Sequence, residues 1–221
     1  MPGMLASHEI RVQVGFMPLA GTLAAPVNAS RLVIFAHGSG SSRHSPRNQA
    51  VAVELQQHGC ATLLMDLLTE AESLDRNNVF DIDLLGTRVV EVARWIRSEG
   101  DPAIAHLPIG LFGASTGAAA ALAAAAELDD EARAVVSRGG RPDLAGHDLP
   151  RVTAPTLLLV GSLDHEVLEL NRQAQKQMRC ENQLVVIHDA THLFEEPGTL
   201  EQVAQHAAGW FGEYMPAPAP Q

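Results

Sequence analysis

Apolar residues in this chain occur either in short continuous runs or in longer stretches where they recur every three to four positions. Continuous runs of four to six apolar residues are typical of strands buried on both faces of a sheet. These runs are at residues 32–36, 61–65, 107–112, 134–137, 156–160 and 184–187. The stretches with helical spacing are at residues 49–58, 84–96, 118–128, 167–178 and 200–214.

The order of these elements predicts the fold class. Strand and helix alternate, which indicates βαβ units and a mostly parallel sheet covered by helices on both faces. Residues 8–14 alternate weakly and residues 20–25 form their expected hairpin partner, which adds an antiparallel edge. We therefore predict a three-layer α/β domain over residues 1–215, followed by a flexible Pro/Ala tail at 216–221.

Composition excludes several classes of partner. The chain has 221 residues, 46% of them hydrophobic, and a formal net charge of -11. An acidic surface repels phosphate backbones and anionic lipids, so we expect neither a nucleic-acid nor a membrane partner. The N-terminus lacks the basic start and apolar core of a signal peptide, which predicts a cytoplasmic protein. The sequence identifies no dimer face, although a homodimer is compatible with it.

The residues just after the strands are the candidates for chemistry, because ligands gather at the carboxyl ends of parallel strands. Gly113-Ala-Ser-Thr-Gly117 follows the strand at 107–112 and precedes a helix, and it matches G-x-S-x-G. A serine at such a tight turn needs small neighbours, which the two glycines provide. Ser115 is therefore the predicted nucleophile, and the amide of Thr116 lies at a helix N-terminus facing developing negative charge.

A nucleophilic serine needs a base and a group that orients the base. Asp164 follows the strand at 156–160, and His192 follows the strand at 184–187. The order Ser, Asp, His is the one expected for this architecture. We predict that these three side chains form a catalytic triad.

Other residues could fill the same roles. Asp189 or Glu195 could be the acid, but both lie in the same stretch as His192. His188 or His165 could be the base, but one follows its strand directly and the other neighbours the candidate acid.

A glycine-rich turn follows the strand at 32–36, with the sequence His37-Gly-Ser-Gly40. It can bring a backbone amide to the carbonyl oxygen under attack, so we predict that Ser39 N–H and Thr116 N–H form the oxyanion hole. Gly38 and Gly40 would then border the substrate, and we interpret His37 as structural.

Taken as an ordered set, HGSGSS, DLLT, GASTG, GSLD and ATHLFEEPG show that the chain resembles the α/β-hydrolases, and within them the dienelactone-hydrolase-like group. The resemblance covers nearly the whole chain. It implies an eight-stranded sheet with one antiparallel strand, no metal and no organic cofactor. Dienelactone hydrolases proper use a cysteine nucleophile where this sequence has Ser115, which favours a plain serine esterase.

A loop length predicts the depth of the site, and three arginines are candidates for binding the substrate. Only about 18 residues separate the strands at 134–137 and 156–160, too few for a lid domain, so we expect an open, shallow site. Arg138 or Arg141 could clamp a substrate carboxylate, or could pair with surface acids in a turn. Arg76 lies in a loop after a strand and is a further candidate pocket residue.

These observations favour a serine hydrolase acting on small carboxylic esters through an acyl-enzyme intermediate. The same triad would serve a thioesterase, a lactonase or an acyltransferase, and the sequence does not separate them. A catalytically silent binding protein on the same scaffold is the non-enzymatic alternative.

Overall fold

A computed structural model describes residues 7–217 of the chain, so the last four residues of the predicted tail lie outside the described residues. Its eight strands form one sheet in the order β1-β2-β4-β3-β5-β6-β7-β8, in which β2 is antiparallel to both neighbours and the other pairings are parallel. The strands are β1 His8–Val14, β2 Met17–Ala24, β3 Arg31–Ala36, β4 Cys60–Met65, β5 Ile109–Ala114, β6 Ala132–Arg138, β7 Thr156–Gly161 and β8 Asn182–Ile187. The predicted mixed, mostly parallel sheet is confirmed.

The continuous apolar runs form strands because both faces of the sheet are covered. Side chains alternate between faces along a strand. On β3, Leu32 and Ile34 pack into one core cluster, while Val33 and Phe35 pack into a second cluster on the opposite face. The central strands therefore need apolar residues at every position, which explains the absence of alternation in them, whereas the edge strand β1 is buried mainly on alternate positions of its second half.

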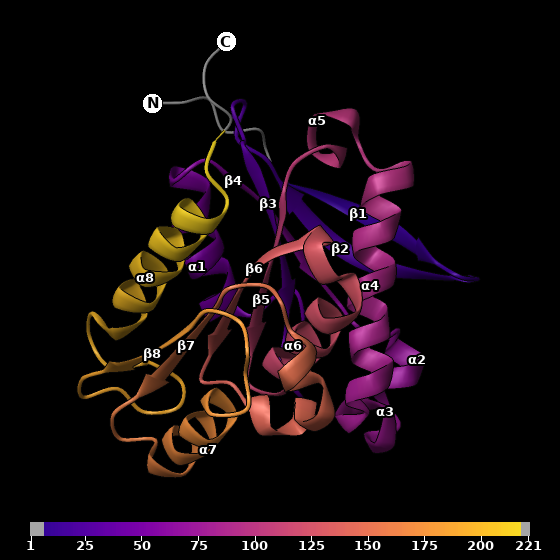
Figure 1. Ribbon diagram of the computed structural model, residues 1–221. Coiled ribbons are helices and arrows are strands. Elements are labelled where there is room, and N and C mark those ends of the chain that lie inside the picture. The colour runs from indigo at the N-terminus through magenta and orange to yellow at the C-terminus, as the bar shows by residue number, and fades with distance from the viewer. Residues whose placement is uncertain (1–6, 218–221) are drawn as a thin grey trace.

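Five longer helices cover the two faces (Figure 1). On one face lie α1 Pro46–Gln57 and α8 Thr199–Tyr214; on the other lie α4 Ile82–Glu99, α6 Thr116–Leu128 and α7 His165–Gln175. Helices α4 and α6 approach closely where Gly86 faces Ala123, because a Cβ at Gly86 would lie 3.0 Å from the Ala123 Cβ. The three-layer arrangement follows from these two apolar helix layers.

Three short helices were not predicted. They are α2 Glu70–Ser73, α3 Arg76–Phe80 and α5 Pro102–Ala105. The segment after β4, expected to be a polar loop, contains two of them. Thr69 and Glu72 form a capping box at α2, and Asp75 caps α3. Helices of four or five residues show no helical period, so only their caps could have revealed them.

The segment between β6 and β7 contains no lid domain, as predicted. It folds as a 3₁₀ segment, η2 Pro142–Arg151, packed against α6, and a shorter one, η1 Asp129–Glu131, precedes β6. Within residues 7–217, no helix combines the length and the apolar character needed to cross a bilayer.

Candidate active site

Ser115 lies at the tight turn between β5 and α6. Its backbone has φ 53° and ψ −125°, a left-handed conformation that is unusual for a residue other than glycine. The flanking glycines are required by close backbone contacts: a Cβ at Gly113 would lie 2.3 Å from Ala118 Cα, and one at Gly117 would lie 2.3 Å from the Ala36 carbonyl oxygen. This strained turn holds the Ser115 side chain at the carboxyl edge of the sheet.

The structure brings Asp164 and His192 together. The Nδ1 atom of His192 lies 2.7 Å from Oδ2 of Asp164. Asp164 occupies the N-cap position of α7, yet its side chain makes no capping hydrogen bond. A carboxylate at this position would normally accept a hydrogen bond from the first turn of the helix. The Asp164 carboxylate instead accepts its hydrogen bond from the His192 imidazole. With Nδ1–H donating to Asp164, Nε2 is the atom left to accept a proton.

The alternative acids and bases have other partners or none. Asp189 pairs with His188 on the surface, at 2.9 Å between Oδ2 and Nδ1. Glu195 pairs with Arg47, at 3.1 Å between Oε1 and Nη1. His165 is exposed at the start of α7. None of them contacts His192 through a hydrogen bond within residues 7–217.

The loop that carries His192 is fixed by bonds that sequence reasoning missed. Thr191 donates from its backbone N–H and from its hydroxyl to the Glu196 carboxylate, at 3.1 and 2.6 Å. These hydrogen bonds lower the pKa of Glu196. Leu163 N–H, beside Asp164, donates to the Ala190 carbonyl at 3.0 Å and joins the acid loop to the base loop.

Ser115 and His192 both contact the end of β6. Ser115 N–H donates to the Arg138 carbonyl at 3.2 Å, and a Cβ at Gly139 would lie 3.6 Å from His192 Cε1. No hydrogen bond joins the Ser115 hydroxyl to His192 within residues 7–217. In enzymes without bound substrate this bond is often long and tightens on binding.

The glycine-rich turn lies against the nucleophile. A Cβ at Gly38 would lie 3.0 Å from Ser115 Cβ, so a larger residue there would crowd the nucleophile. Ser39 N–H, a predicted oxyanion donor, donates to the Thr116 hydroxyl at 2.8 Å. The Thr116 N–H, at the first turn of α6, has no acceptor among the described residues. An oxyanion between these amides would therefore share or replace the Thr116 hydroxyl as acceptor for Ser39 N–H.

A cavity of about 500 Å³ opens beside this turn. Its walls are residues 37–43, residues 66–68 after β4, and side chains of α2, α3 and α4, including Glu70, Val79 and Leu85. Helices α2 and α3 form a wall of this cavity that the sequence did not predict, but Ser115, Asp164 and His192 do not line it, so the open, shallow site expected at the triad stays a prediction. The cavity is large enough for a small acyl or alcohol group.

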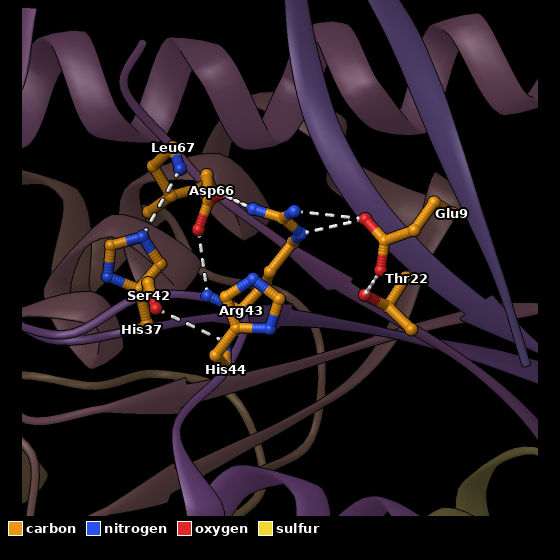
Figure 2. Close-up of polar contacts among 8 residues, drawn as sticks. All are labelled: Glu9, Thr22, His37, Ser42, Arg43, His44, Asp66 and Leu67. Carbon is orange, nitrogen blue, oxygen red and sulfur yellow. Dashed lines mark hydrogen bonds and ion pairs between the residues drawn. The ribbon is translucent and has the colours of Figure 1, made fainter. Parts of the chain in front are cut away.

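His37 connects the two loops that line this cavity. Its Nε2 accepts the Leu67 N–H at 3.3 Å (Figure 2). Burial lowers its pKa, so the ring is neutral and can act as that acceptor. The interpretation of His37 as a structural residue agrees with these contacts.

An ion-pair network that the sequence did not suggest supports the same two lining segments, residues 37–43 and 66–68. Figure 2 shows Arg43 between the carboxylates of Asp66 and Glu9. Glu9 also accepts the Thr22 hydroxyl at 2.8 Å. The network joins the turn after β3 to the edge strands β1 and β2, and so fixes one rim of the cavity.

The three candidate substrate-binding arginines have different environments. Arg141 makes two hydrogen bonds to Asp143, at 2.9 and 2.8 Å, which is the surface pairing considered as its alternative. Arg76 lies on α3 with its guanidinium 5.6 Å from the centre of the Phe80 ring, and it does not line the cavity. Arg138 is buried at the end of β6 without a partner among the described residues.

One group of side chains has the spacing of metal ligands. Asp83, His147 and Asp148 offer atoms within 4.8 Å of one another, away from the triad. Asp148 already pairs with Arg151 at 2.7 Å, and His147 is mostly exposed. We assign no metal to this group.

The sheet order, the strained serine turn and the acid–histidine pair at the same sheet edge define an α/β-hydrolase. No family model matches the chain. A dienelactone hydrolase from Anabaena variabilis is 51% identical, with a TM-score of 0.91 over 95% of this chain and 98% of that one. The chain therefore belongs to the dienelactone-hydrolase-like family of α/β-hydrolases, as the sequence motifs implied.

Two further comparisons place the chain among known proteins. Two proteins from strains of Mycobacterium tuberculosis, provisionally named phosphoribosyl transferases, are 55% identical over 216 residues. This match covers 98% of the chain but 48% of those proteins, so the chain spans about half their length. Est1E from Butyrivibrio proteoclasticus is 18% identical with a TM-score of 0.79, which shows the shared fold alone.

Proposed function

We propose that this chain is a serine hydrolase that cleaves small carboxylic esters with Ser115, His192 and Asp164. The observation that carries the proposal is the 2.7 Å bond from His192 Nδ1 to an Asp164 carboxylate that does not cap its own helix. It leaves Nε2 free to act as a base at the sheet edge where Ser115 is held in a strained turn.

The reaction has two acyl-transfer steps. Ser115 Oγ attacks the ester carbon while its proton moves to His192 Nε2, and the oxyanion receives hydrogen bonds from Ser39 N–H and Thr116 N–H. The carbon–oxygen bond to the alcohol breaks as His192 returns the proton to the leaving oxygen. Water then attacks the acyl carbon and gives a proton to His192 Nε2. The bond from that carbon to Ser115 Oγ breaks as His192 returns the proton to Oγ, which releases the carboxylic acid and restores the enzyme.

The cavity favours a small substrate. A volume of about 500 Å³ beside Ser39 accommodates a short acyl or alcohol group. We propose ester hydrolysis rather than phosphoribosyl transfer for this chain, because its candidate site supports acyl transfer and it covers 48% of the relatives with that name. Thioesters and lactones are further substrates for the same triad.

Labelling by a fluorophosphonate probe tests the proposal. The wild type should react at Ser115 and hydrolyse 4-nitrophenyl acetate, and Ser115→Ala should lose labelling and about 10⁴-fold or more in kcat. Ser98→Ala is a matched control, because Ser98 is exposed near the C-terminus of α4 and its hydroxyl bonds only to backbone carbonyls of that helix. Equal turnover by wild type and Ser115→Ala would reject the assignment.

A further inference from the structure

The buried face of helix α7 includes one polar residue. The residues of this face are Val167, Leu168, Asn171 and Ala174. Asn171 is 0% exposed, and asparagine is a poor helix former because its side chain competes for backbone hydrogen bonds. Its Oδ1 atom is enclosed without a hydrogen-bond donor among the described residues. Since an unpaired buried amide oxygen costs stability, an asparagine at this position needs an explanation.

The amide group of Asn171 joins α7 to the loop after β6. Its Nδ2 atom donates to the Val167 carbonyl at 2.8 Å, within the helix, and to the Gly140 carbonyl at 2.9 Å. Both partners are carbonyl oxygens, which accept hydrogen bonds and cannot donate them, so the nitrogen of the amide must face them. Within residues 7–217, Asn171 is the only side chain that hydrogen-bonds to the backbone of the loop at 138–141.

This loop holds both backbone groups of the proposed nucleophile. The Ser115 N–H donates to the Arg138 carbonyl at 3.2 Å, and the Arg141 N–H donates to the Ser115 carbonyl at 3.1 Å. The carbonyl of Gly140 and the N–H of Arg141 belong to one peptide group, which is planar and rigid. The bond from Asn171 at one end of that peptide therefore fixes the direction of the N–H that holds Ser115 at the other end.

The same loop packs closely against the proposed base and against α6. A Cβ at Gly139 would lie 3.1 Å from the His192 carbonyl oxygen and 3.6 Å from its Cε1 atom. A Cβ at Gly140 would lie 2.0 Å from Ser137 Oγ and 2.5 Å from Ala118 Cβ. The loop thus contacts the base and the first turn of α6, and a shift of the loop would disturb both.

We propose that Asn171 is a positioning residue of the proposed triad: by holding the loop at 138–141, it keeps Ser115 Oγ within reach of His192 Nε2. This inference rests on the proposed function and adds a residue that acts through the backbone of Ser115 without touching the substrate. Helix α7 begins directly after Asp164, so one side chain connects the helix beside the proposed acid with the turn of the proposed nucleophile. Misplacement of catalytic groups by about 1 Å can cost roughly 10²-fold in rate.

Two substitutions of Asn171 test the link to Gly140. Asn171→Leu removes both hydrogen bonds at similar volume, and it should lower kcat on 4-nitrophenyl acetate by about 10²-fold with little change in KM. The rate of fluorophosphonate labelling at Ser115 should fall by a similar factor. Asn171→Thr keeps a bond to the Val167 carbonyl, because a threonine hydroxyl bonds to the carbonyl four residues earlier, but its side chain is too short to reach Gly140. It should show the same loss of kcat; wild-type kcat in Asn171→Thr would overturn the proposal.

A matched control separates positioning from stability. Thr156 is fully buried, and its hydroxyl donates to the Ala154 carbonyl at 3.0 Å at the amino end of β7. Thr156→Val therefore removes the same kind of bond, from a side chain to a backbone carbonyl, at the sheet edge opposite the site. It should lower the free energy of unfolding without changing kcat or the labelling rate. Equal losses of kcat in Thr156→Val and Asn171→Leu would show an effect of stability alone, and the proposal would fail.

Amide hydrogen exchange separates this proposal from the catalytic one. In Asn171→Leu, the amides of Ser115 and Arg141 should exchange about 10-fold faster or more, because the loop that bonds to them is released. The Val135 amide, which donates to the Pro155 carbonyl at the other end of β6, should be unchanged. If the wild type is not labelled at Ser115 but exchange is faster, the catalytic proposal fails and the link to the serine turn stands. If labelling succeeds and exchange is unchanged, the positioning role fails and the hydrolase stands.

Discussion

Gly117 is the position where a single methyl group should disturb both the nucleophile and the oxyanion hole. A Cβ added there would lie 2.3 Å from the Ala36 carbonyl oxygen and 2.4 Å from the His37 carbonyl oxygen. These distances are about 1 Å shorter than an ordinary van der Waals contact. Both oxygens belong to the backbone, so no side-chain rotation relieves the clash in Gly117→Ala.

The N-terminus of α6 and the end of β3 must therefore separate by about 1 Å. Thr116 lies on one side of that gap, and the turn carrying Gly38 and Ser39 lies on the other. Misplacement of catalytic groups by about 1 Å can cost roughly 10²-fold in rate. Overpacking of this kind costs about 1–3 kcal/mol of stability. We expect Gly117→Ala to show both losses.

Ester hydrolysis and urea denaturation measure the two effects. Gly209→Ala is the matched control, because this helical glycine in α8 has no atom within 4 Å of the added Cβ. It should gain up to about 1 kcal/mol in unfolding free energy at unchanged kcat/KM. If Gly117→Ala matches the wild type in unfolding free energy and in kcat/KM, the close packing at the serine turn is refuted.

Other variants test the site, the cavity wall and the buried charge. Asp164→Asn should lower kcat by about 10⁴-fold because it favours the wrong imidazole tautomer, and Asp189→Asn should not. Burial acts to raise the pKa of Glu72, but hydrogen bonds from Thr69 and a nearby guanidinium leave it lowered. The stability from ionised Glu72 is therefore present above pH 4.5 and lost as the pH falls through its lowered folded-state pKa. Glu72→Gln should lose about 1–2 kcal/mol of unfolding free energy at pH 7, a difference that shrinks on acid titration. Arg138→Met should be as stable as the wild type or up to about 2 kcal/mol more stable in urea at pH 7; a clear loss would reveal a structural partner.

The strands and the candidate catalytic residues were predictable because both depend on short, local patterns. A strand buried on both faces must be apolar throughout, as at residues 32–36 and 156–160. The carboxyl ends of parallel strands share one edge, so residues after different strands are predicted to meet. The meeting of Asp164 and His192, 28 residues apart, follows from the adjacency of β7 and β8.

The cavity and its supporting ion pairs could not be predicted in the same way. Helix α2 begins with a capping box over four residues. So short a pattern also occurs often by chance, so it does not identify a helix in the sequence alone. The contact between Arg43 and Glu9 joins residues 34 positions apart, one in the turn after β3 and one on the edge strand β1. Nothing in either local sequence specifies the partner, because the strand order alone determines which loops become neighbours.

Several unfavourable features of this molecule lie where the site is proposed, although Asp129, before the start of β6, also has positive φ. Ser115 and the buried Phe194 both have positive φ, at 53° and 55°, and such conformations cost about 1–3 kcal/mol each. Arg138, with its unpaired charge, lies at the same carboxyl edge of the sheet. None of these features is needed to form the eight-stranded sheet. Glycine at the two turns and an apolar residue on β6 would give a more stable protein. Their location at one edge is the pattern expected when stability is sacrificed for a functional site.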